Sequence, residues 1–157
     1  MKASPWIIAA AALAFVLPAP ASAGVGDPEV IIYRFPGVRD DGGANNTGVA
    51  TVFHCTNFSG VDETIRLVTR DADGTLKTNI ANVIPHLVTL TFGTHFVVAY
   101  AGEISLSTAS VGQGTTAIAA TSINIICTCE TIDASAAVPI GVARRGIRFN
   151  PVPGSQE

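Results

Sequence analysis

Apolar and polar residues alternate with a period of two along most of this 157-residue chain. In residues 49–57, Val49, Phe53 and Cys55 fall on one face, because alternate side chains of a strand point the same way. Similar β-type runs occupy residues 29–35, 63–71, 75–84, 86–92, 96–100, 103–107, 117–132 and 141–149. No segment combines helical periodicity with capping residues. The pattern therefore predicts an all-β protein.

Turn-forming residues separate these runs at short intervals. Asp71-Ala-Asp-Gly74 predicts a hairpin turn, since Asp-Gly readily supplies the positive φ that tight hairpins need. Glycine-rich stretches at residues 39–48 and 110–116 predict two longer loops. Short strands spaced in this way are typical of antiparallel sandwiches and barrels. We expect an immunoglobulin-like β-sandwich of about seven to nine strands, with a small β-barrel as the alternative.

The first 23 residues have the three zones of a secretory signal peptide. Lys2 precedes an apolar run over residues 6–17, and Ala21-Ser-Ala23 forms an A-x-A cleavage site. The apolar run is shorter than the roughly 20 residues of a membrane span. We therefore predict a cleaved signal peptide at 1–23, a single domain at 24–157, a periplasmic or secreted location, and no membrane attachment after cleavage.

The charge of the predicted mature chain argues against nucleic acid as a partner. Without Lys2, eight Lys and Arg residues stand against 12 Asp and Glu residues, a net charge of −4. Such a balance gives no broad attraction for phosphate backbones or anionic lipid. The one basic cluster, Arg144, Arg145 and Arg148, is most simply a solvated face.

Three cysteines carry most of the candidate chemistry. Ile123, Ile125, Cys127 and Cys129 are expected to line the core-facing side of one strand, as Cys55 does on another. Inward cysteines on separate strands of an exported protein suggest a disulfide. Cys55–Cys127 and Cys55–Cys129 both satisfy this reasoning. A Cys127–Cys129 bond is less favourable, since residues i and i+2 of a strand lie about 6.5–7 Å apart.

Other catalytic or metal-binding patterns are weak, and we predict a protein that is not an enzyme and uses no metal or cofactor. His54 and Cys55 are neighbours in a strand, so they point to opposite faces and do not readily share one ion. Zinc-site spacings such as C-x-x-C do not occur. No nucleophile elbow orders Ser, His and Asp into a triad.

Several segments resemble a group of small exported bacterial proteins with no assigned activity. They are residues 49–60 (VATVFHCTNFSG), Asp71–Gly74, the Ile-Ile-Cys run at 125–127 and residues 147–157 (IRFNPVPGSQE). The resemblance implies a sandwich fold, an export route and one cysteine near each of Cys55 and Cys127. On that basis we expect a Cys55–Cys127 disulfide, with Cys129 as a spare thiol or an alternative partner.

Two functional interpretations follow. The first is a non-catalytic structural or protein-interaction module of the bacterial envelope, which would bind a protein partner or self-assemble through sheet edges or loops. The loops predicted at 39–48 and 110–116 are its expected contact surfaces. The alternative is a small-ligand or metal-binding periplasmic protein that uses its Cys and His residues.

Overall fold

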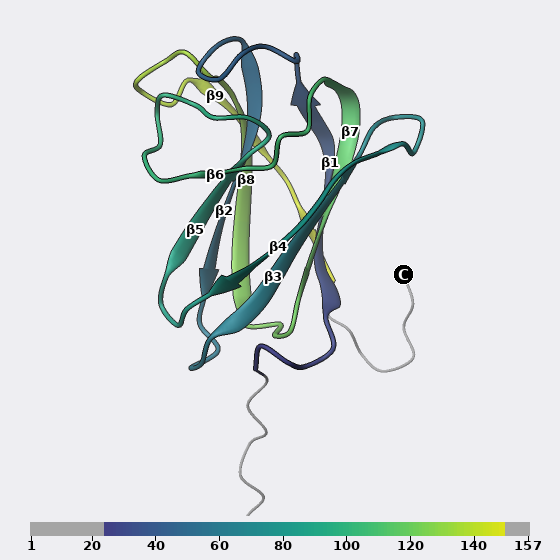
Figure 1. Cartoon of the computed structure of the whole chain (residues 1–157), viewed down its shortest axis with the longest axis vertical. Coiled ribbons are helices and arrows are strands. Elements are labelled where there is room, and N and C mark those ends of the chain that lie inside the picture. The colour runs from purple at the N-terminus through teal and green to yellow at the C-terminus, as the bar shows by residue number, and fades with distance from the viewer. Residues whose placement is uncertain (1–23, 150–157) are drawn as a thin grey trace, which may run out of the picture.

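Residues 24–149 form two stacked β-sheets in a computed structural model of the chain (Figure 1). The strands are β1 (Val30–Asp40), β2 (Val49–Asn57), β3 (Glu63–Arg70), β4 (Leu76–Ile84), β5 (Thr89–Gly93), β6 (Ile104–Ser105), β7 (Val111–Ala120), β8 (Ile125–Asp133), β9 (Gly141–Arg144) and β10 (Ile147–Arg148). The strand orders are β10-β1-β7-β3-β4 in one sheet and β6-β5-β2-β8-β9 in the other. The short β5–β6 pair is parallel, and the other recorded pairs are antiparallel.

These sheets confirm the predicted antiparallel β-sandwich. The ten strands exceed the seven to nine expected, because the predicted runs at 117–132 and 141–149 each include parts of two strands, β7 and β8 in the first and β9 and β10 in the second. The described strands do not close into the alternative barrel, since each sheet keeps its own two edge strands.

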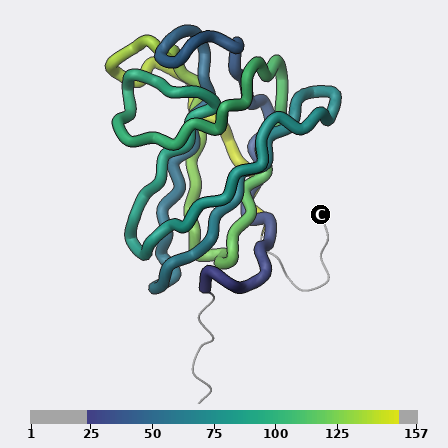
Figure 2. Tube along the Cα trace, in the orientation of Figure 1, coloured from purple at the N-terminus to yellow at the C-terminus, as the bar shows by residue number. Residues whose placement is uncertain are grey.

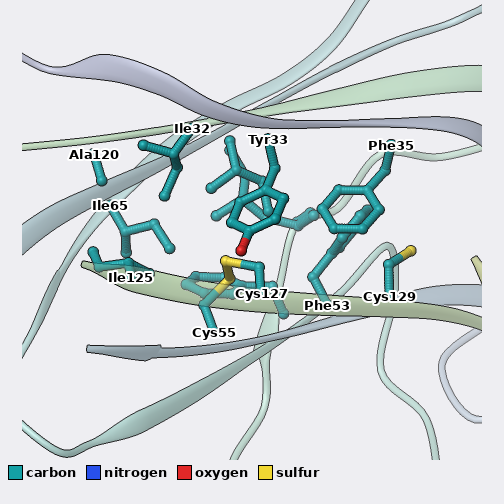
Figure 3. Close-up of a cluster of buried hydrophobic side chains, with 14 of the residues drawn as sticks. Ile32, Tyr33, Phe35, Phe53, Cys55, Ile65, Ala120, Ile125, Cys127 and Cys129 are labelled. Atoms are coloured by element: carbon teal, nitrogen blue, oxygen red, sulfur yellow. A yellow bond between two sulfur atoms is a disulfide. The ribbon is translucent and has the colours of Figure 1, made fainter. Parts of the chain in front are cut away.

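The main core lies between the two sheets. It is built from the inward side chains of both layers, including Phe35 of β1, Phe53 of β2 and Leu67 of β3, none more than 1% exposed. Phe35 and Phe53 come from opposite sheets and pack edge-to-face with ring centroids 5.6 Å apart. Figure 3 shows side chains of this apolar cluster around the bonded sulfur atoms of Cys55 and Cys127.

The predicted hairpin turn at Asp71–Gly74 is confirmed. The Asp71 N–H donates to the Thr75 carbonyl at 2.9 Å, and Gly74 adopts a φ of +85°, which an L side chain rarely accepts. The turn joins β3 to β4 and projects from the body of the sandwich in the Cα trace (Figure 2).

The loop predicted at residues 110–116 is wrong, because Val111–Ala120 is strand β7 between β1 and β3. Glycine is needed there for close backbone approach. A Cβ on Gly114 would lie 2.4 Å from the Arg70 carbonyl oxygen of β3. The predicted contact surface at 110–116 is therefore largely paired within a sheet.

The strand predicted at residues 96–100 is also wrong. Residues 94–103, which we call the outer strap, connect β5 to β6 and pass over the outer face of the β2–β8 sheet. Val97 of the strap is 4% exposed and joins a second apolar cluster with Val52 and Ile132. A short apolar run can bury itself in this way without pairing as a strand, and its periodicity does not distinguish the two cases.

Two further predictions differ from the structure, at Ile123 and in the run at 141–149. Ile123 precedes β8 in a turn and is 42% exposed, so it is not on the core face as predicted. The run at 141–149 divides into β9 and β10, which belong to different sheets.

The predicted signal peptide, residues 1–23, lies outside the described residues. Within 24–149, no helix has the length and apolarity to cross a bilayer.

Candidate functional site

Cys55 and Cys127 form a disulfide in the core-facing layer of the β2–β8 pair. They are direct partners in the strand register, with Cα atoms 4.2 Å apart. This is the pair expected from the resemblance to small exported proteins, and it links two strands of one sheet. In Figure 3 the Tyr33 hydroxyl points toward the bonded sulfurs, which apolar side chains otherwise surround. The bond is thus part of the core.

Cys129 is a spare thiol, because its place in the register is opposite Phe53 rather than Cys55. Figure 3 shows its sulfur pointing away from the disulfide. Burial raises the pKa of the Cys129 thiol to about 12, although the charge of Arg144 acts in the opposite direction. Since the thiolate is the reactive and metal-binding form, this environment keeps Cys129 chemically inert near neutral pH.

The three histidines lie in separate environments. His54 is on the outer face of β2, His86 accepts a hydrogen bond from the Gly60 N–H at 3.0 Å, and His95 lies in the outer strap. Across residues 24–149, no three His, Cys, Asp or Glu side chains are grouped closely enough to hold a metal ion. The sequence-based alternative of a Cys/His ligand site therefore gains no geometric support from these placements.

A buried polar pair anchors the end of β1 to the outer strap. Nδ1 of His95 lies 2.8 Å from Oδ2 of Asp40, and both residues are at most 7% exposed. Nε2–H of His95 donates to the Thr47 carbonyl at 3.0 Å. Both ring nitrogens are thus engaged, and the loop after β1 is fixed at Thr47. Sequence reasoning missed this pair, whose residues are 55 positions apart.

A second polar network fixes the far end of the strap to the sheet. The Tyr100 hydroxyl donates to Glu130 of β8, and the His54 ring packs edge-on to the Tyr100 ring at 4.6 Å. Nδ1 of His54 is also 3.0 Å from the Thr91 hydroxyl. Burial, followed by the bond to Glu130, raises the pKa of Tyr100 to about 12. Tyr100 therefore keeps its proton and serves as a hydrogen-bond donor holding the strap.

The outer edge of β4 is the most prominent unpaired feature of the described residues. The other three edge strands are short, with two residues in β6, two in β10 and four in β9, whereas β4 has nine. Within residues 24–149, β4 pairs with β3 alone, so one side of its backbone has no strand beside it. Lys77, near one end, is its only charged residue. Natural edges are usually blunted by charge, proline or short length.

The inward face next to this edge is incompletely covered. Because residues 145 and 146 join β9 directly to β10, those two edges close one side of the sandwich, and β4 and β6 border the other. Ile80 of β4, Leu90 of β5 and Ile104 of β6 pack against the core but remain partly exposed. We call β4 and these three side chains the open side.

An unsatisfied amide also lies at the open side. Asn82 points inward from β4, as its register partner Ile65 does from β3. Its Nδ2 atom is buried and has no hydrogen-bond partner among the described residues. A buried polar atom left in this state costs about 1–3 kcal/mol. Sequence periodicity placed Asn82 on a strand but did not identify that strand as an edge.

No known family model matches the sequence, and neither a curated protein nor a solved structure is significantly similar to the chain. The resemblance to small exported proteins stays a prediction.

Proposed function

We propose that this chain is an exported, non-catalytic interaction module of the bacterial envelope that binds another polypeptide by strand addition at β4. The observation that carries the proposal is the nine-residue edge, unpaired on its outer side within residues 24–149. An added strand would satisfy that row of backbone N–H and C=O groups. Main-chain hydrogen bonds supply affinity in this binding mode, and flanking side chains supply specificity.

The chemistry of the remaining candidate residues supports a non-catalytic role. The Cys129 thiol is buried with a pKa of about 12, and both nitrogens of His95 are engaged within the fold. A structural disulfide suits an oxidising compartment, which supports a periplasmic or secreted location. The negative net charge supports a protein partner over nucleic acid.

Site-specific photo-crosslinking in the native host tests the proposal. A photoreactive amino acid replaces Ala81, an exposed residue of β4, and a matched variant carries it at Ile126, which is 48% exposed on β8. We expect a discrete cross-linked product from position 81 and none from position 126. Absence of a product from position 81, with normal accumulation of the protein, would contradict strand addition at β4.

A further inference from the structure

We infer that the strand added at β4 is the β4 strand of a second copy of this chain, giving a two-fold symmetric dimer with one continuous sheet. The inference rests on the proposed function and names its partner. A two-fold axis perpendicular to the sheet pairs the strands antiparallel and keeps inward residues opposite inward residues. Maximum overlap of the nine residues places Ile80 opposite the partner's Ile80.

This register supplies a partner for the orphan amide. Counting outward from Ile80, Asn82 stands directly opposite the partner's Thr78, and both residues point inward. Opposite side chains in an antiparallel pair have Cβ atoms about 4.5–5.5 Å apart, close enough for an amide to bond a hydroxyl. A hydroxyl both donates and accepts, so it satisfies either orientation of the amide. Because Nδ2 is buried in the single chain, the Asn82 side chain rotates toward the edge to make this contact, and symmetry repeats it for both amides.

The charges of β4 are compatible with self-pairing. The same register, counted through the irregularity that β4 has at Lys77, places this residue beside the partner's Val83, so the two lysines of the dimer do not meet. The strand itself carries no carboxylate, and Asp71 in the turn before it lies 3.3 Å from Lys77 and offsets part of that residue's charge. A long edge with one peripheral charge is thus free of the like-charge opposition that prevents self-association in many edge strands.

Apolar burial adds to the backbone pairing. Ile80 meets the partner's Ile80 across the axis, and Leu90 and Ile104 border the same open side of the sandwich. All three side chains are already partly buried against the core. Bringing two open sides together removes apolar surface from water, which favours association.

The Lys77–Val83 pairing allows a charge test that leaves the core untouched. Val83 is 50% exposed, so Val83→Glu and Val83→Lys are both expected to fold. Val83→Glu puts an opposite charge beside the partner's Lys77 at two symmetric positions, and Val83→Lys puts a like charge there. Two such pairs change the dimer dissociation constant by roughly two- to thirtyfold at low salt. The control pair is Val142→Glu and Val142→Lys on β9, 63% exposed.

Sedimentation equilibrium of the protein, recovered in the form its host produces, measures these constants. We expect a concentration-dependent dimer that Val83→Glu tightens, Val83→Lys weakens, and neither Val142 variant alters beyond the effect of net charge. Net charge alone would act in the reverse direction, because the protein is acidic. A dimer whose dissociation constant does not change with the Val83 substitutions would overturn the inference. A protein that is monomeric at every concentration would also overturn it.

Different results would overturn strand addition at β4 and the second copy as its partner. A monomer that still cross-links to a different protein from position 81 would overturn the second-copy inference and keep strand addition. A monomer with no cross-linked product, and with β4 amides protected from hydrogen exchange at all dilutions, would mean that a terminal segment of the same chain covers the edge. That outcome would overturn both proposals.

Discussion

Cys55 and Cys127 face each other directly across two neighbouring strands of one sheet, with Cα atoms 4.2 Å apart and sulfurs bonded. The two residues are separated by 72 positions in sequence. In antibody domains the conserved disulfide instead connects the two sheets. Here the bond fixes the β2–β8 register, and Phe35 and Phe53 contribute to the packing between sheets.

Removing the disulfide is expected to lower the free energy of unfolding substantially. Closing a loop of this length restricts the unfolded chain by an amount worth about 4 kcal/mol in the chain-entropy account, with typical measured values of 2–4 kcal/mol. Urea unfolding with and without reductant measures the difference. Alkylation under denaturing conditions should modify one cysteine before reduction and three after it. Equal unfolding midpoints in both states would contradict a stabilising bond.

Cys129 is expected to resist alkylation in the folded protein. With burial raising its pKa to about 12, its thiolate population near pH 8 is far below that of an exposed cysteine, whose pKa is about 8.5. Alkylation should be at least about a hundredfold slower than in the urea-unfolded, unreduced chain. Timed mass spectrometry with a thiol reagent gives both rates, and Cys129→Ala is the blank. Rapid reaction of the native protein would show that the thiol is accessible.

Local patterns in the sequence predicted much of the sheet and both bonded cysteines. The period of two placed Phe53, Cys55 and Cys127 on core-facing sides, as the structure does. The turn at 71–74 followed from its Asp-Gly chemistry. Each of these features depends on side chains within a few residues of one another.

Features that depend on distant partners could not be predicted in this way. The role of Gly114 is set by the Arg70 carbonyl on another strand, so a glycine-rich stretch was interpreted as a loop. Val97 is buried by Val52 and Ile132, and its own neighbours carry no sign of this. The strand order also determines that β4 is an edge, and alternation along the strand is the same for edge and central strands.

Replacing Glu103 with Gln is expected to alter the pH dependence of stability. Glu103 is 8% exposed, its Oε1 accepts the Val97 N–H, and its Oε2 has no partner among the described residues. Burial raises the pKa of Glu103, although the Val97 bond and the His95 charge oppose this. The folded state therefore holds the proton to higher pH than the unfolded chain. The contribution of the Glu103 carboxyl to the free energy of unfolding is fully present below the ordinary pKa of 4.5. It is lost as the pH rises through the pKa of the folded state.

Urea unfolding of wild type and Glu103→Gln at acidic and neutral pH measures this effect. We expect the variant to gain stability relative to wild type as pH rises. Asp73→Asn is the contrasting control, since hydrogen bonds from Thr75 lower the pKa of Asp73 and its contribution has the opposite sign. A stability difference for Glu103→Gln that does not change with pH would contradict the assignment.

Adding one methyl group at Gly114 is expected to disrupt the centre of a sheet. The Cβ of Gly114→Ala would lie 2.4 Å from the Arg70 carbonyl oxygen and 2.5 Å from Cγ1 of Val111. The carbonyl belongs to β3, whose Arg70 pairs with Thr115 of β7, so it cannot move away without disturbing the ladder. Overpacking of this kind costs about 1–3 kcal/mol or more.

Gly112→Ala provides the matched control for this substitution. Gly112 lies on the same strand two residues earlier, and a Cβ there would meet nothing within 4 Å. We expect its free energy of unfolding to stay within about 0.5 kcal/mol of wild type, as for most surface changes. Thermal and urea unfolding of both variants measure the contrast. Equal stabilities would mean that β3 and β7 do not approach closely at Gly114, and that this glycine-rich stretch is the loop its composition suggested.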